Sequence, residues 1–223
     1  MNRIRKLKLS VIITLITFIM GISAWFFYTS SIFQKPHLEL PDGKWEKTFF
    51  KGIDEVTESA GLEKLREKNL HKKDIEIRVW RGFGLGPLEG MIFNQTDNQW
   101  AVYYLSQDEK SELTKANVNQ LLRNPKSGWD SFIKQIYDAG ILELPDLDAI
   151  NCDVSTIDGM SYVVEIYKDK VYRTYRYNSL SEKKCNEGKQ MNEIAKIIAK
   201  EFYDGTQKCK RAEWLPCLSR YSE

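Results

Sequence analysis

Four aspartates crowd one predicted loop of the chain, where paired carboxylates could act on a substrate. Two carboxylates can share the acid and base roles of glycoside hydrolysis, and several carboxylate oxygens can hold a divalent cation. Their spacing does not match an EF-hand, and a solvated acidic loop has the same composition. We therefore keep a hydrolase that uses carboxylates of residues 146–158 as an alternative function. The four residues are Asp146, Asp148, Asp153 and Asp158.

A glycine-rich run, Gly82, Gly84 and Gly86, is the second group that could contact a ligand. Glycines that hold a phosphate lie between a strand and the first turn of a helix, whose amides face the anion. Here the run joins two predicted strands, which is typical of a wide hairpin loop. Phe83 and Leu85 are unusually apolar for such a loop. They either form a partner-binding tip or fold back on the core.

Tyrosines and arginines alternate along a predicted hairpin near the C-terminus. Aromatic rings on neighbouring strands are common cross-strand partners inside a sheet. Exposed Tyr and Arg side chains are also frequent hot spots of binding surfaces. We predict that this hairpin and the glycine-rich loop bind an envelope protein or a glycan. The predicted binding residues are Phe83, Leu85, Tyr162, Tyr172, Arg173, Tyr175 and Arg176.

Known catalytic motifs are absent from the sequence. It contains no Gly-x-Ser-x-Gly elbow and no His-Glu-x-x-His pair. The two histidines, His37 and His71, lie in a predicted linker and a charged loop, far from every cysteine. Zinc sites usually need ligand pairs at closer spacing. We therefore predict no metal and no cofactor, and a domain that is not an enzyme.

The N-terminal segment predicts a single membrane-spanning helix. Residues 1–8 carry four basic and no acidic side chains, and residues 9–34 carry no charge. We assign residues 1–8 to the cytoplasm and residues 9–33 to a signal-anchor helix in the lipid bilayer. About 20 residues at ~1.5 Å each span a bilayer core of ~30 Å. The basic side chains stay cytoplasmic, so the C-terminal part is exported.

A cleaved signal peptide is the alternative interpretation of this segment, and it would release a secreted soluble factor. Signal peptides have a shorter apolar run that ends in small residues. Here four aromatic residues, 25–28, follow the pair Ser23-Ala24 directly. Aromatic rings favour the membrane interface, which supports a retained helix in the inner (plasma) membrane with a periplasmic domain.

The basic character of the chain belongs to this anchor. The sequence has 33 Lys and Arg against 31 Asp and Glu, and five of the basic residues lie at or before Lys35. Removing those five leaves 28 basic against 31 acidic residues, a net charge of −3 for residues 36–223. A nucleic-acid-binding domain would be basic. The composition therefore argues against a nucleic-acid partner.

The first half of the exported part predicts a linker, a helix and a three-stranded meander. Two prolines and a glycine interrupt residues 34–48, and residues 49–70 have helical spacing with a break near Gly61. Alternation of apolar and polar residues then predicts three antiparallel strands. These strands occupy residues 75–80, 88–93 and 100–105.

Two helices are predicted in the second half. Ser127 is placed to cap a helix over residues 128–139, and Gly140 would stop it. Apolar residues at helical spacing predict an amphipathic helix over residues 187–203. Residues 111–123 are ambiguous, with a weak helical preference.

A hairpin lies between these helices and suggests how the four cysteines pair. Its strands, 162–168 and 171–177, turn at Asp169-Lys170, so the numbers of facing residues sum to 339. Extending this register brings Cys152 and Cys185 within two residues of each other. We favour a Cys152–Cys185 disulfide and a Cys209–Cys217 disulfide, although four cysteines allow three pairings. Closing these loops would stabilise the fold by ~4 and ~2.5 kcal/mol.

Together these patterns predict an α+β fold. Antiparallel sheet, formed by the meander and the hairpin, would pack against about three helices in a domain over residues 49–206. A C-terminal tail, 207–223, would carry the small disulfide loop. The function predicted for this arrangement is that of a membrane-anchored envelope protein with a non-catalytic binding domain.

Overall fold

The structure is a computed structural model. It describes residues 17–22, 37–39, 46–83, 88–107, 117–150, 152 and 161–202. The chain divides into two units, Met1–Lys35 and Pro36–Glu223.

In the first unit, residues 17–22 are helical and carry exposed apolar side chains, among them Phe18 and Met20. Among the residues that the structure describes, no helix is long and apolar enough to cross a membrane. The other residues of the predicted anchor, 9–16 and 23–33, lie outside the described residues, as do the predicted segments 1–8 and 207–223.

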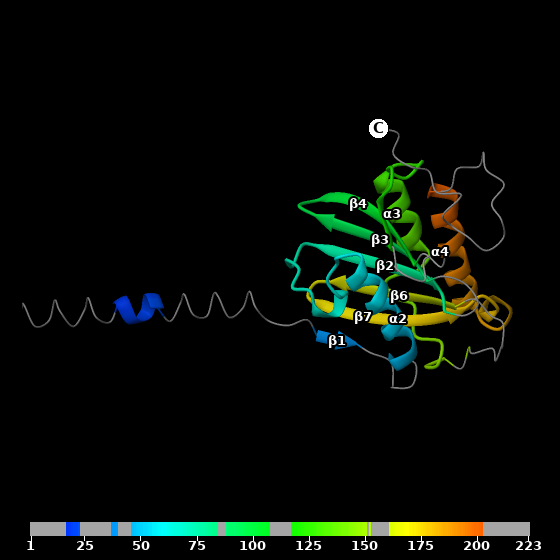
Figure 1. Cartoon of the computed structure of the whole chain (residues 1–223), viewed down its shortest axis with the longest axis horizontal. Helices are drawn as coiled ribbons and strands as arrows, with labels where there is room; N and C mark the ends of the chain where they lie inside the picture. The colour runs from blue at the N-terminus through cyan, green and yellow to red at the C-terminus, as the bar shows by residue number, and fades with distance from the viewer. Residues whose placement is uncertain are drawn as a thin grey trace, which may run out of the picture. The chain divides into compact units, whose positions relative to one another are not determined.

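A seven-stranded sheet forms the centre of the second unit, with the order β1-β7-β6-β2-β3-β4-β5 (Figure 1). Every neighbouring pair is antiparallel except β1 and β7, which run parallel. The α+β class is therefore confirmed. The strands are β1 (His37–Glu39), β2 (Ile75–Gly82), β3 (Glu89–Thr96), β4 (Gln99–Gln107), β5 (Asn117–Leu121), β6 (Ser161–Lys168) and β7 (Val171–Asn178).

The predicted meander and hairpin are present with their expected pairing. Strands β2, β3 and β4 pair in sequence order. In the hairpin, Lys168 faces Val171 and Tyr162 faces Tyr177, so the predicted sum of 339 is confirmed. Positive φ angles at Asp169 and Lys170, 52° and 67°, identify the two-residue turn.

Two strands were not predicted. Residues 37–39 form β1 within the segment that we assigned to a linker, and their partner Val171–Arg173 lies more than 130 residues away. Residues 117–121 form β5 beside β4, where a weak helical preference was expected. Both predictions were wrong because these short strands are held by pairing partners and not by a local hydrophobic pattern.

Helices cover both faces of the sheet. On one face, α2 and η1 pack against a core that includes Trp80 and Tyr167; on the other, α3 and α4 pack against Ile77 and Val79. Alternation along β2 explains the division, because successive side chains point to opposite faces. The helical elements are α2 (Glu46–Ser59), η1 (Leu65–Glu67), α3 (Trp129–Asp138), η2 (Ser181–Lys183) and α4 (Asn186–Phe202).

Glycine ends α2 where the sequence indicated a break. Gly61 has a φ of 72°. The Leu62 amide donates to the Thr57 carbonyl, and the Gly61 amide donates to the Glu58 carbonyl. This pair of bonds is the Schellman motif, which favours glycine because the left-handed conformation crowds a Cβ.

The start of α3 differs from the prediction. Gly128, with a φ of 81°, occupies the N-cap position and no side chain caps the helix. Ser127 instead donates its backbone amide to the buried carboxylate of Glu201 in α4 at 2.8 Å. The predicted Ser127 cap was therefore wrong. The residue ties the beginning of α3 to the end of α4.

The outer edge of β7 is covered along most of its length. Strand β1 pairs with Val171–Arg173. Further along β7, the Arg176 amide donates to Asp146 Oδ2 at 3.0 Å, and the Asn178 amide donates to Ser181 Oγ at 3.3 Å. A strand and two side chains thus satisfy backbone groups that an uncovered edge would expose.

We name the two ends of the sheet, at which the strands begin or end, after a residue that lies there. The Gly82 end is where Gly82, Glu89, Ser161 and Asn178 are aligned by strand pairing. The Lys170 end is the opposite one, where Ile75 is aligned with Lys168 and Gln95, and where the β6–β7 turn lies.

Candidate functional site

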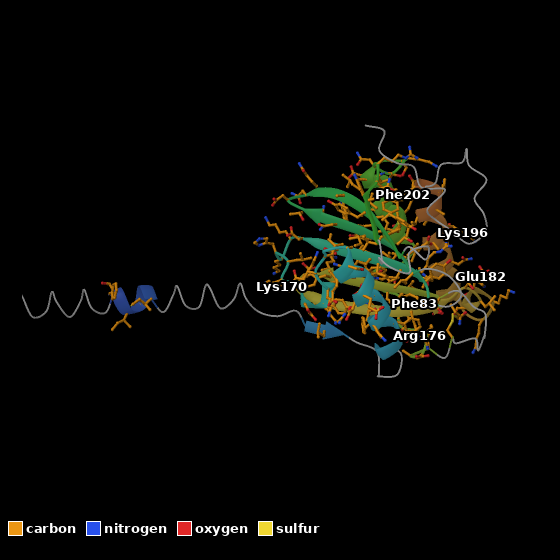
Figure 2. All side chains as sticks on the ribbon, in the orientation of Figure 1. Phe83, Lys170, Arg176, Glu182, Lys196 and Phe202 are labelled. Carbon is orange, nitrogen blue, oxygen red and sulfur yellow. A yellow bond between two sulfur atoms is a disulfide. The ribbon has the colours of Figure 1, made fainter. Side chains whose placement is uncertain are left out.

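The Gly82 end brings together several of the residues predicted to bind a partner. Phe83 directly follows β2, Tyr162 lies near the start of β6, and Arg176 lies near the end of β7. Strand pairing aligns all three positions at this end. Figure 2 shows Phe83 and Arg176 on the same side of the domain. Leu85 lies outside the described residues.

Phe83 folds back against α2. Its ring packs edge-on against Phe49, with ring centroids 4.7 Å apart and an interplanar angle of 79°. The side chain is half-buried at the margin of the α2 core. Of the two alternatives left open for Phe83, the structure favours packing at the rim of the core over a projecting tip.

Arg176 lies beside the Phe49–Phe83 ring pair and adds a positive charge to it. Its Nη2 lies 2.8 and 2.9 Å from the two carboxylate oxygens of Asp148, and its Cζ lies 5.9 Å from the centre of the Phe49 ring. Its Nε has no hydrogen-bond partner in the described part of the chain. We call the set of Phe49, Phe83, Asp148 and Arg176 the Phe83 corner.

Asp146 has a structural role in the loop that borders this corner. Its carboxylate accepts hydrogen bonds from the amides of Asp148 and Arg176, both at 3.0 Å. Burial raises the pKa of Asp146, and these two hydrogen bonds oppose the rise. Asp146 therefore holds the loop against β7, while Asp148 pairs with Arg176 at the surface. Asp153 and Asp158 lie outside the described residues.

Two tyrosines predicted to bind a partner belong to the core. Tyr172 and Tyr175 are both fully buried. The Tyr172 hydroxyl donates to Glu165 Oε1 and the Tyr175 hydroxyl to the Ile141 carbonyl, each at 2.8 Å. The prediction of surface stacking was wrong for these two rings because helices cover both faces of the hairpin.

The other two residues of the hairpin set have different surroundings. Arg173 donates to the carbonyls of Leu142 and Leu144, and so holds the loop after α3 against β7. Tyr162 is half-buried and faces Arg81 across the β2–β6 ladder. Burial raises the pKa of Tyr162.

A polar cluster that the sequence analysis missed lies beside Tyr162. Arg81 Nε is 3.2 Å from Glu89 Oε2, and the Tyr104 hydroxyl donates to Glu89 Oε1 at 2.7 Å. Burial raises the pKa of Tyr104. Strand pairing could have suggested this cluster, because Arg81 and Glu89 are the last pair before the glycine-rich loop.

A second missed cluster is buried under α2 and η1. Arg78 and Glu165 face each other across β2 and β6, and both are fully buried. Arg78 Nε donates to Glu76 Oε1 at 2.7 Å, and Lys68 Nζ donates to Glu76 Oε2 at 2.6 Å. Glu165 accepts hydrogen bonds from Trp80 Nε1 at 2.6 Å and from the Tyr172 hydroxyl.

This buried ionic cluster, Glu76, Arg78 and Glu165, is stabilised internally. Burial raises the pKa of Glu165, while Arg78 and the two hydrogen-bond donors oppose the rise. Arg78 Nη2 also donates to the Glu63 carbonyl at 2.8 Å, just before η1. The arrangement ties the α2–η1 layer to the sheet.

The predicted Cys152–Cys185 disulfide is confirmed. The Cα atoms are 5.9 Å apart, and Cys152 is fully buried. The Cys185 sulfur also accepts the Gly188 amide at 3.1 Å, next to the first turn of α4. The bond therefore fixes the loop after α3 to the start of α4. The second predicted pair, Cys209 and Cys217, lies outside the described residues.

Among the described residues, no three His, Cys, Asp or Glu side chains are grouped so as to hold a metal ion. A comparison with models of known protein families and with curated protein sequences finds no match.

Proposed function

We propose that the chain is a single-pass, membrane-anchored envelope protein whose exported domain binds a partner without catalysing a reaction. The observation that carries this proposal is the exposed apolar helix of residues 17–22, within a stretch of the sequence that has no charged residue. Exposed apolar surface of this kind is unfavourable in water and favourable in a bilayer.

The side chains of this helix support the proposed anchor. Phe18 is 69% exposed and Met20 is 68% exposed. A helix in a soluble domain normally buries such residues along one stripe. A helix that is apolar on all sides suits an environment of lipid.

The disulfide supports the proposed export. Cys152–Cys185 joins segments 33 residues apart in the sequence and is built into the core. Disulfides of this kind persist in oxidising compartments and are rare in the reducing cytosol. The positive charges before the apolar stretch give the same orientation by the positive-inside rule.

The Phe83 corner is the surface that we propose for the partner. It combines two rings with the half-buried guanidinium of Arg176, which lies near the Phe49 ring and pairs with the exposed Asp148. Aromatic and arginine side chains contribute most to binding at protein interfaces. An envelope protein or a glycan could contact this corner through stacking and hydrogen bonds.

Alkaline carbonate extraction of the full-length protein from cell membranes tests the anchor. We expect the wild-type chain to stay in the membrane, and the double variant Ile16→Lys, Ile19→Lys to be lost from it. Each lysine adds roughly 2.5–3.5 kcal/mol to insertion near the helix centre. The control Leu121→Lys, on an exposed residue of β5, should leave extraction unchanged. Extraction of the wild-type chain would contradict the anchor, and a shortened mature N-terminus would indicate cleavage.

Crosslinking in intact cells tests the binding surface. The double variant Phe83→Ser, Leu85→Ser should lose its crosslinked envelope partner. Loss of the Phe49–Phe83 ring pair should cost about 0.5–1.5 kcal/mol beyond the burial that the half-buried Phe83 ring loses. Because a domain typically has about 5–15 kcal/mol of stability, the variant should still fold. Leu121→Ser, which also removes an exposed apolar side chain, should keep the partner. A folded double variant that retains the partner would rule out this surface.

A further inference from the structure

Lysines from two separate segments meet at the Lys170 end of the sheet. Lys72 and Lys73 lie in the turn before β2, Lys168 ends β6, and Lys170 is the second residue of the β6–β7 turn. Strand pairing aligns Ile75 with Lys168, so the two segments are neighbours. Figure 2 shows Lys170 at the opposite side of the domain from Arg176 and Glu182.

Three of these lysines are available to a partner. Lys72, Lys73 and Lys168 are exposed, and within the described part of the chain they form no salt bridge. Three acids lie at the same end: the buried Asp74 and the exposed Asp97 and Asp169. Four lysines against these three acids leave an excess of one positive charge there. Residues 36–223 as a whole have 28 basic and 31 acidic residues, so the basic end contrasts with a net negative domain.

The length of the chain between the proposed anchor and β1 limits where this end can lie. If the membrane helix ends at Phe33, four residue steps lead to His37, the first residue of β1. Four steps extend at most about 14 Å. His37 pairs with Val171, directly after the β6–β7 turn. If the proposed anchor spans the membrane, a tether of this length limits the distance between His37 and the bilayer surface.

We propose that the Lys170 end docks on the anionic phospholipid headgroups of the bilayer that holds the anchor. This proposal rests on the proposed anchor. The reach of the tether is similar to the ~8–10 Å over which charges interact at physiological salt. Each lysine near an anionic leaflet favours the docked state by about fivefold. Docking would orient the domain so that the Phe83 corner points away from the membrane.

Hydrogen–deuterium exchange of the full-length protein in lipid nanodiscs tests the docking. One set of nanodiscs contains only phosphatidylcholine, and the other contains about 30% phosphatidylglycerol. We expect amides of residues 71–73 and 169–170 to exchange at least about tenfold more slowly in the anionic nanodiscs. The triple variant Lys72→Glu, Lys73→Glu, Lys168→Glu should lose this difference.

A matched variant controls for total charge. Lys183→Glu, Lys189→Glu, Lys196→Glu makes the same charge change on exposed lysines of η2 and α4, and should keep the protection. Equal exchange in both lipids, from a protein that remains in the nanodisc, would overturn the docking proposal alone. Failure to enter nanodiscs would overturn the anchor as well. Protection that appears only with added soluble polyanion, such as polyphosphate, would overturn docking on lipid.

Discussion

Replacing Arg78 with leucine should lower the free energy of unfolding by about 3–5 kcal/mol. The substitution leaves Glu76 and Glu165 buried without their central positive charge, and it removes the hydrogen bond to the Glu63 carbonyl that holds η1 to the sheet. A buried charge that loses its partner keeps its full desolvation penalty. Urea unfolding followed by fluorescence would measure the loss.

The dependence of this loss on pH identifies its cause. Burial raises the pKa of Glu165 and Arg78 opposes the rise, so removing Arg78 should raise that pKa further. A carboxyl whose pKa rises on folding contributes stability that is present below its unfolded pKa and lost as pH rises through the folded value. The difference in the free energy of unfolding between the wild type and Arg78→Leu should therefore be larger at about pH 8 than at about pH 5.

Lys134→Leu is the matched control for Arg78→Leu. Lys134 pairs with Asp138 on the exposed side of α3, with the two side chains 74% and 64% exposed. Its loss should change stability by less than about 0.5 kcal/mol. If Arg78→Leu and Lys134→Leu lowered the free energy of unfolding by equally small amounts, the buried ionic cluster would not hold the α2–η1 layer in place.

Removing the disulfide with Cys152→Ala and Cys185→Ala should destabilise the domain by about 4 kcal/mol. The bond closes a loop across a separation of 33 residues, and chain entropy predicts a loss of this size. Alanine is the better replacement because Cys152 is fully buried, where a serine hydroxyl would need a partner. Urea unfolding under oxidising conditions gives the measurement.

A second pair of variants separates the two predicted disulfides. Cys209→Ala with Cys217→Ala should cost about 2.5 kcal/mol if those residues close their short loop. If the Cys152→Ala, Cys185→Ala variant lost no more stability than the Cys209→Ala, Cys217→Ala variant, the larger contribution expected of the Cys152–Cys185 bond would be contradicted. Small domains typically have only 5–15 kcal/mol of stability, so the larger loss would leave the domain marginal in a reducing compartment.

Local patterns in the sequence predicted the antiparallel elements well. Alternating side chains located β2, β3 and β4, and the Asp169-Lys170 turn set the register of β6 and β7. These strands pair with neighbours that are close in the sequence, so the local alternation of apolar and polar residues is enough to predict both the strands and their pairing. The Cys152–Cys185 bond was predicted by extending that register on paper to the two cysteines, and the structure contains the bond.

Features that depend on distant contacts could not be predicted in this way. Alternation in β2 located the strand but not the burial of Glu76 and Arg78, because the sequence does not reveal that α2 covers that face. The same cover explains why Tyr172 is buried. The three residues of β1 carry no pattern of their own, since only β7 defines them as a strand.

The candidate site was predicted in part. Phe83, Tyr162 and Arg176 do lie at one end of the sheet, since strand register alone determines which residues share an end. The contacts of the Phe83 corner were not predicted, because Phe49 comes from a helix whose position over the sheet is set by tertiary packing.

The covered edge of β7 limits how copies of the domain could polymerise. Asp146 and Ser181 bond amides of β7 beyond the three residues that β1 pairs, so among the described strands the sheet ends in β1 on one side and in β5 on the other. A fibre built edge to edge needs two open edges on every copy. On the β1 side, growth could use only the three residues of that strand, whereas β5 offers five, so the two edges are unequal partners.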